Sequence, residues 1–316
     1  YMPNYLSKHG GAIYKSVNNL SMWAKVLIVV VLSLVLCIHL NNRCTKHEGF
    51  GNKEELKLRE GNEIYDDFYA NVYDALTYAH PKNEFEMRAT EKNAKATSQS
   101  IILDIGSGTG HHIKQFKELG ITNATGVDKS KAMIKKAKEL YPDNKYVHGD
   151  ALNPSLFKSS EFTHITCFYF TIYYFKDKKQ FFENCYNWLK PGGHLIVHVV
   201  DNEMFDPILP PANPLSMVSP QRYAKKRITH SNVIFDEFKY NAEFDLKDDD
   251  TATFTEKFTT RDSNKLFRKN KHEMYMEDDQ RIAALAQTSG FLVAEKLHMV
   301  KAEYEFQYLY VFQKPE

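Results

Sequence analysis

Residues 101–110 read IILDIGSGTG, and this segment constrains the fold more than any other part of the chain. Its first residues are isoleucine and leucine, as expected of a short strand buried on both faces of a parallel sheet. Three glycines follow at alternate positions, Gly106, Gly108 and Gly110. Because glycine has no Cβ, the backbone can turn tightly there and a ligand can lie against it. The segment therefore predicts a strand that ends in a ligand-binding loop.

From residue 100 onward, strand-like and helix-like segments alternate, which is typical of a parallel sheet with crossover helices. Strands are predicted at 101–104, 124–128, 145–150, 164–170 and 194–200. The helices are predicted at 111–119, 131–140 and 178–190, and a helix at 278–290 precedes two closing strands at 291–300 and 306–314. The alternation predicts an α/β fold with a doubly wound sheet.

The alternation fails after residue 200. Residues 201–220 contain five prolines, which exclude a long helix or strand. Segments 232–245, 251–260 and 272–276 then alternate with a period of two, as antiparallel strands do. We predict a β-rich insert or cap over residues 201–277.

Residues 22–40 are apolar enough to suggest a membrane-spanning helix, since 26–37 are interrupted only by Ser33. A secretory signal and a buried helix are the alternatives, but no cleavage site follows the segment. Basic residues behind it favour a cytoplasmic catalytic domain on a single-pass anchor. The predicted organisation is a polar segment at 1–21, the membrane helix, a linker at 41–60 and one domain at 61–316.

Composition excludes several classes of protein. The 316 residues are 43% hydrophobic and 26% charged, as in ordinary globular chains. A net charge of +1 gives no general reason to expect nucleic acid as a partner. The four cysteines lack the paired spacing of zinc or redox motifs, so we expect a reducing compartment and no metal site.

Acidic residues at three strand ends point to the ligand. Asp104 ends the first strand just before the glycines, Asp128 ends the second and Asp150 ends the third. A carboxylate at Asp104 repels a pyrophosphate and attracts an ammonium group, while Asp128 can accept hydrogen bonds from ribose hydroxyls. With no lysine in the glycine loop, these residues describe a pocket for a nucleoside that carries an amino acid and no phosphate. S-adenosylmethionine is such a ligand.

Residues from about 60 to 316 resemble the class I S-adenosylmethionine-dependent methyltransferases. The resemblance runs through LDIGSGTG, GVDKS, HGDAL and WLKPGGHLIVHV, in that order. It implies a seven-stranded Rossmann-like sheet whose last strand is antiparallel, and S-adenosylmethionine as the cofactor. It also implies cofactor contacts at Gly106, Ser107, Gly108, Gly110, Asp128, Lys129, Asp150 and Ala151. An aromatic residue after the fourth strand, Phe168 or Tyr169, is expected to face the sulfonium, and Asp104 and Tyr73 complete the predicted cofactor site.

The catalytic residues are less well defined by the sequence. The fourth strand continues as FYFTIYY and lacks the Asn/Asp-Pro-Pro-aromatic motif of enzymes that methylate exocyclic amines of bases. A general base is needed only if the acceptor arrives protonated. Tyr173, Tyr174 and His198 are the candidates.

We therefore predict a membrane-anchored methyltransferase that acts on a small-molecule or lipid-like acceptor, with a protein partner left open. The alternatives are an anchored scaffold that retains the fold without catalysis and a nicotinamide-dependent reductase. The reductase would need a Tyr-x-x-x-Lys pair, which Tyr174 and Lys178 supply only loosely.

Overall fold

The computed structural model describes residues 21–41, 56–212, 221 and 224–316, with side chains at 21–33 in the first range. The chain divides into two compact units, Tyr1–Lys53 and Glu54–Glu316. In the first unit, helix α2 covers Met22–Asn41.

The predicted membrane span at 22–40 is not confirmed, although a helix forms there. Among the described residues, no helix combines the length and the apolar character needed to cross a bilayer. The cytoplasmic, membrane-bound location stays a prediction from the sequence.

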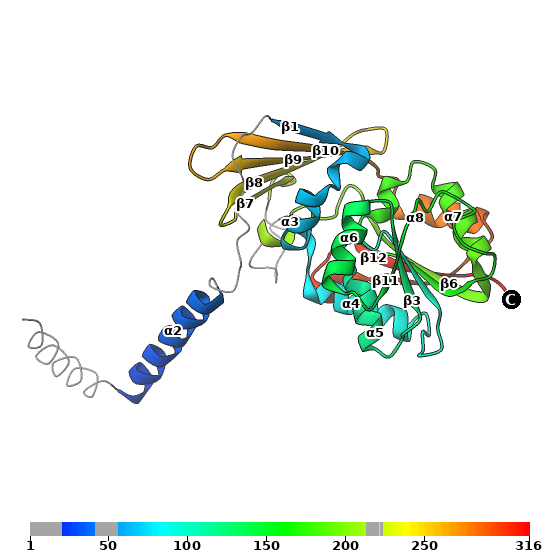
Figure 1. Ribbon diagram of the computed structural model, residues 1–316, viewed down its shortest axis with the longest axis horizontal. Helices are drawn as coiled ribbons and strands as arrows, with labels where there is room; N and C mark the ends of the chain where they lie inside the picture. Colours follow the sequence, from blue (N-terminus) through cyan, green and yellow to red (C-terminus); the bar gives the residue numbers. More distant parts are fainter. Residues whose placement is uncertain (1–20, 42–55, 213–220, 222–223) are drawn as a thin grey trace, which may run out of the picture. The chain divides into compact units, whose positions relative to one another are not determined.

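The second unit contains the predicted seven-stranded sheet (Figure 1). Its parallel strands are β2 (Ile102–Ile105), β3 (Ala124–Asp128), β4 (Lys145–His148), β5 (Phe162–Cys167) and β6 (Leu189–Val200). The closing strands are β11 (Leu292–His298) and β12 (Gln307–Gln313), and the order across the sheet is β11-β12-β6-β5-β2-β3-β4. Strand β12 runs antiparallel to both neighbours, β6 and β11. The mostly parallel α/β fold with its antiparallel last strand is confirmed.

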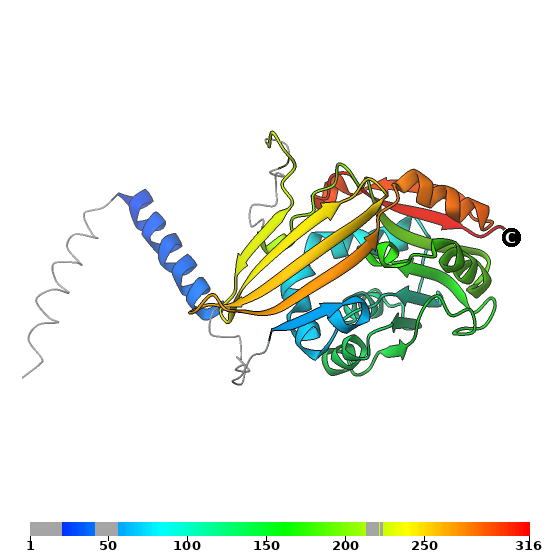
Figure 2. The same ribbon diagram turned by 90° about the horizontal axis from the view of Figure 1, so that it is seen from above.

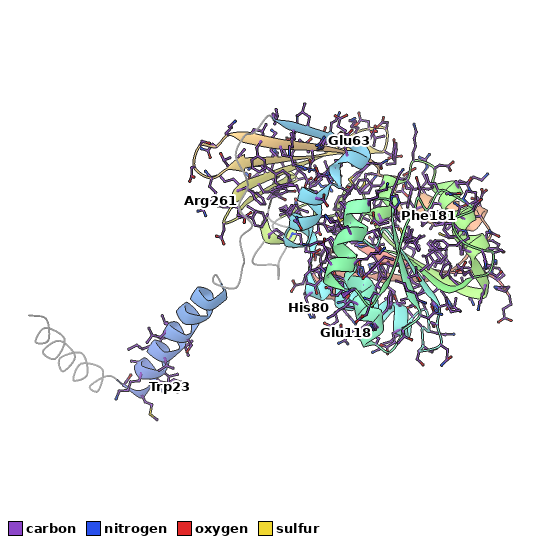
Figure 3. The ribbon with its side chains drawn as sticks, in the orientation of Figure 1. Trp23, Glu63, His80, Glu118, Phe181 and Arg261 are labelled. Carbon is purple, nitrogen blue, oxygen red and sulfur yellow. The ribbon has the colours of Figure 1, made fainter. Side chains whose placement is uncertain are left out.

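Helices cover both faces of this sheet. On one face lie α4 (His80–Lys92), α5 (His111–Glu118) and α6 (Lys131–Leu140), which share a core that contains Met87, Phe116 and Ile134. On the other face, α7 (Lys178–Trp188) and α8 (Asp279–Thr288) bury Phe181 and Ile282. Figure 3 labels Phe181 on α7 and Glu118 at the end of α5, and only the phenylalanine is buried.

A second sheet of five strands lies beside the first (Figure 2). Its strands are β1 (Lys57–Glu60), β7 (His230–Ile234), β8 (Phe238–Leu246), β9 (Thr251–Thr260) and β10 (Leu266–Tyr275), in the order β1-β10-β9-β8-β7. Strands β7 to β10 form an antiparallel meander, whereas β1 pairs parallel with the edge of β10. Residues 57–60 belong to the predicted linker at 41–60, but they form strand β1, because their backbone pairs with that of β10.

The tyrosine-rich segment connects the two sheets. It covers residues 61–77 and consists of the short helix η1 (Gly61–Ile64) and helix α3 (Asp67–Thr77). Asp66 separates them, and its side chain caps α3 by accepting a hydrogen bond from the Tyr69 N–H at 3.0 Å. Helix α3 packs in a common core with Met133 of α6 and with Tyr240 and Phe258 of the second sheet.

Candidate active site

A cavity of about 510 Å³ opens at the carboxyl ends of the parallel strands, a size typical of small-molecule sites. Gly106 and Gly108, which follow β2, line this cavity. Asp128 at the end of β3 and Asp150, which follows β4, line it as well. Tyrosines of the η1–α3 segment and side chains from β9 and β10 line the opposite wall. Ligands of open α/β sheets bind in the same place, outside the carboxyl ends of the strands.

The glycine loop has no room for side chains. Gly106 has a φ of +70°, and a Cβ there would collide with the side chain of Thr171. Gly110 has a φ of +88° at the N-cap of α5, where a Cβ would collide with Tyr146. Both glycines are required by conformation and by space. These two glycines let Thr171 and Tyr146 pack against the loop backbone, whereas Gly108, which lines the cavity, has only the Tyr73 ring near the position of a Cβ, at 3.6 Å.

Asp128 holds this loop in place. One carboxylate oxygen accepts a hydrogen bond from the Gly108 N–H at 2.9 Å, and the other accepts from the Ser130 N–H at 2.8 Å. Burial raises the pKa of Asp128, and the two backbone hydrogen bonds oppose that rise. Each oxygen has further lone pairs, so the carboxylate can still accept from a pair of ligand hydroxyls.

Asp150 lies at the next strand end, and Lys129 lies beside it with its ammonium 2.7 Å from the carboxylate. Burial alone would raise the pKa of Asp150, but the bonds from Lys129 and from the Leu152 N–H lower it. The carboxylate therefore stays ionised and able to accept a hydrogen bond from an exocyclic amine.

The structure places seven of the eleven predicted cofactor residues on the cavity: Tyr73, Gly106, Gly108, Asp128, Lys129, Asp150 and Ala151. The other four, Asp104, Ser107, Gly110 and Phe168, lie beneath its surface. Tyr169, the alternative named with Phe168, lines the cavity in the left-handed conformation with a φ of +53°. Phe168 points away and packs against the ring of His112, with 4.8 Å between the ring centroids.

Asp104 is fully buried under the glycine loop. Its Oδ1 accepts a hydrogen bond from the Thr166 hydroxyl at 2.7 Å, and within the described part of the chain Oδ2 has no hydrogen-bond partner. Burial raises the pKa of Asp104 to about 6. Nδ1 of His112 lies 4.0 Å from Oδ2, so the carboxylate faces this histidine beneath the loop and does not line the cavity.

Behind Asp104 lies a buried charge cluster that the sequence did not reveal. Glu86 of α4 accepts from Lys82 at 3.0 Å and contacts His112 at 2.9 Å. Burial would raise the pKa of Glu86, but the Lys82 charge and the histidine hydrogen bonds outweigh it and hold the pKa well below its usual range. The cluster fixes α4 behind the loop.

Only one of the three predicted catalytic candidates reaches the cavity. Tyr173 is buried, and its hydroxyl accepts from the Val200 N–H at 2.7 Å. His198 is also buried, between Gln307 at 2.9 Å and Glu86 at 3.4 Å. Tyr174, at the end of helix η2 (Thr171–Tyr174), lines the cavity and is 37% exposed.

Two cavity residues were missed by the sequence analysis, Glu256 on β9 and His272 on β10. The Glu256 carboxylate lies 2.8 Å from Nε2 of His272, and Nδ1 of His272 lies 2.8 Å from the Tyr174 hydroxyl. The sequence contains a signal for Glu256, because this residue lies on the same face of its strand as Ala252, Phe254 and Phe258. A carboxylate on an apolar face is expensive to bury and therefore informative.

Part of the chain matches a known protein family. Residues 103–197 match the family model described as a methyltransferase domain. By this match, residues 103–197 form a methyltransferase domain. No curated protein matches the chain in sequence.

Solved structures share the fold of this methyltransferase domain. An S-adenosylmethionine-dependent methyltransferase from Clostridium acetobutylicum has a TM-score of 0.56 and 17% identity, over 79% of this chain and 97% of the other. The sugar N-methyltransferase KedS8 from Streptoalloteichus has a TM-score of 0.58 and 18% identity, over 86% and 100%. CalS10, an amino pentose methyltransferase from Micromonospora echinaspora, has a TM-score of 0.54 and 15% identity, over 85% and 100%.

Proposed function

We propose that the protein transfers a methyl group from S-adenosylmethionine to a small molecule that enters the cavity between the two sheets. The carrying observation is that one cavity joins the glycine loop and strand-end carboxylates to a wall of tyrosines, Glu256 and His272. Cofactor and acceptor can therefore meet in one enclosed space. A lipid-like acceptor, also predicted from the sequence, stays untested.

The residues of the chain have distinct roles in this proposal. The glycine loop, with Asp104 buried beneath it, would hold the amino acid part of the cofactor, Asp128 the ribose and Asp150 the adenine. When bound, the cofactor supplies an electrophilic methyl group on a sulfonium. The protein would mainly align the acceptor with that methyl group, and such positioning can account for about 7–11 kcal/mol of a barrier.

The similar structures support a small acceptor. KedS8 is named a sugar N-methyltransferase, and CalS10 an amino pentose methyltransferase. Their sequences are too distant from this chain for their substrates to be assigned to it, but a sugar-sized acceptor agrees with the cavity volume.

Calorimetric titration of the full chain with S-adenosylmethionine, and separately with NADH, tests the proposal. We expect micromolar binding of S-adenosylmethionine and no binding of NADH. Asp128→Ala removes the acceptor of the Gly108 N–H and should weaken binding at least tenfold. Asp143→Ala, at an exposed position, is the control and should bind normally.

Each other outcome supports a different function. Binding of NADH alone would favour the reductase. Tight binding of S-adenosylmethionine without methyl transfer to any small molecule would favour the scaffold.

A further inference from the structure

We propose that Tyr174, His272 and Glu256 form a proton relay that deprotonates an amine acceptor, an inference that rests on the proposed methyltransferase function. The three side chains come from three separate elements, η2, β10 and β9. They meet on the cavity wall opposite the glycine loop.

Glu256 is the fixed end of the relay. Its Oε1 accepts hydrogen bonds from the hydroxyls of Tyr69 at 3.0 Å and Tyr240 at 2.6 Å. Its Oε2 accepts from the Asn270 amide at 2.8 Å and contacts His272 at 2.8 Å. Four partners occupy the roughly four lone-pair sites of the carboxylate. Glu256 therefore cannot take a proton from a substrate and instead orients the imidazole.

The hydrogen bonds of Glu256 determine which nitrogen of His272 carries the proton. An ionised carboxylate only accepts, so Nε2 of the imidazole must be the donor to Glu256. Burial would raise the pKa of Glu256, but the charge of a protonated His272 and the hydrogen bonds from His272, Tyr240 and Asn270 outweigh it and lower the pKa. The hydrogen bonds from Tyr240 and Asn270 favour the ionised carboxylate whether or not His272 is protonated. In neutral His272, Nδ1 is then an acceptor, and the Tyr174 hydroxyl donates to it at 2.8 Å.

Tyr174 is the open end of the relay. Tyr174 is 37% exposed and lines the cavity. Its oxygen accepts a hydrogen bond from Tyr65, and its second lone pair can accept one from a bound molecule. Burial raises the pKa of Tyr174, which makes a free tyrosinate unfavourable. Tyr174 must therefore release its own proton to His272 as it receives one from the acceptor.

The proposed step combines two proton transfers with the transfer of the methyl group. An ammonium N–H proton of the acceptor passes to the Tyr174 oxygen, while the Tyr174 proton passes to Nδ1 of His272. The freed nitrogen lone pair forms a bond to the methyl carbon as the carbon–sulfur bond breaks, and that electron pair stays on sulfur. The relay ends with a neutral tyrosine and an imidazolium that is paired with Glu256.

The charge of the wall favours an amine over a hydroxyl acceptor. Lys247 and Lys271 also line the cavity, but among the described residues no lysine or arginine is recorded within ion-pair distance of Glu256. When His272 is neutral, the Glu256 carboxylate therefore keeps its negative charge. Tyrosine faces line the same wall, and such faces attract cations. An imidazole changes charge near neutral pH and can take a proton from an ammonium ion, whereas a hydroxyl group is far less acidic.

Tyrosine rings and charged groups surround His272. Tyr65, Tyr69 and Tyr174 have ring centroids about 6 Å from the imidazole, at 6.0, 6.0 and 5.9 Å. Glu256 faces it from β9, and Arg268, farther along β10, is paired with Asp66. Its sequence neighbours Lys271 and Glu273 also line the cavity.

Nuclear magnetic resonance of the full chain with labelled histidine tests the resting state of the relay. We expect the single proton of the neutral His272 imidazole to lie on Nε2. Tyr174→Phe should shift the Nδ1 resonance of His272, and His272→Gln assigns the signals. A proton on Nδ1, or an Nδ1 resonance whose position is unchanged in Tyr174→Phe, would overturn the relay.

Methyl transfer tests its action. The probes are methyl-tritiated S-adenosylmethionine with glucosamine and 4-amino-4-deoxyarabinose, each beside its hydroxyl counterpart. We expect transfer to an amine, and a loss of kcat of about 10²-fold in Tyr174→Phe and His272→Gln at pH 7. Cofactor affinity should stay within twofold, and the loss should shrink above pH 9, where the free amine predominates. A purely structural role would not give this rescue.

The controls are His230→Gln, an exposed histidine beside Glu243 at 3.2 Å on the same sheet, and Tyr308→Phe outside the cavity. Both should keep full activity. Transfer only to hydroxyl groups, equal losses at every pH, or no transfer to any amine while the cofactor binds would contradict the relay alone. Failure to bind S-adenosylmethionine would contradict the proposed function as well.

Discussion

At the scale of single residues, Asp104 should make stability depend on pH. Burial raises its pKa from 3.8 to about 6, so the folded protein binds its proton more tightly than the unfolded chain does. This contribution to stability is therefore present below pH 4 and lost as the pH rises to about 6. Asp104→Asn lacks the titrating group. Its unfolding free energy relative to the parent should rise by up to about 3 kcal/mol between pH 4 and pH 7.

Urea unfolding of both proteins at pH 4, 5, 6 and 7 measures this difference. A difference that stays constant across the four pH values would show that Asp104 ionises normally in the fold.

Single residues were predictable where a strand end positions them. Asp128 and Asp150 follow apolar strands directly, so the parallel sheet alone brings them to one edge. Glu256 and His272 are separated by a hairpin, and only its register brings them together. In that register Glu256 lies opposite Asn270, which makes His272 its diagonal neighbour. No local pattern reveals such a diagonal pair.

At the scale of elements, the join between η1, α3 and β10 should be sensitive to one carboxylate. Arg268 is 1% exposed, and its guanidinium donates to Asp66 at 2.7 Å and to the Ile64 carbonyl at 2.7 Å. Asp66→Ala removes both the α3 cap and the charge partner of a buried arginine. We expect it to lower the unfolding free energy by about 3–5 kcal/mol.

Asp278→Ala is the matched control, because Asp278 caps α8 from the Arg281 N–H at 2.7 Å and is exposed. It should cost only about 1 kcal/mol by denaturant unfolding. Equal losses in the two variants would mean that the pair with Arg268 adds nothing to the cap.

Elements with apolar periodicity were predictable, and the others were not. Helix α5 buries Ile113 and Phe116 at the spacing of an amphipathic helix. Helix α4 buries Lys82, Asn83 and Glu86, so its inward face is polar in the sequence. Its partners come from other elements, such as His112 of α5, and no segment of the sequence shows them together.

At the scale of the whole molecule, the cofactor should stabilise the folded state. A ligand that binds only the native protein at one hundred times its dissociation constant adds about 2.7 kcal/mol. In a chain of this size, we expect the melting temperature to rise by about 2–6 °C. Thermal unfolding with and without S-adenosylmethionine checks this, and Asp128→Ala, which weakens binding at least tenfold, should reduce the shift at the same cofactor concentration by about half or more. The same shift in that variant would place the binding site elsewhere.

The pairing of β1 with β10 has a consequence for how the protein is made. Residues 57–60 leave the ribosome early, yet their partner strand spans 266–275. Such a distant pairing must wait until nearly the whole chain has been synthesised. The wall that carries His272 is therefore completed late in synthesis. Chains that end near residue 200 contain the glycine loop but lack this wall, so an early stop in translation leaves no active enzyme.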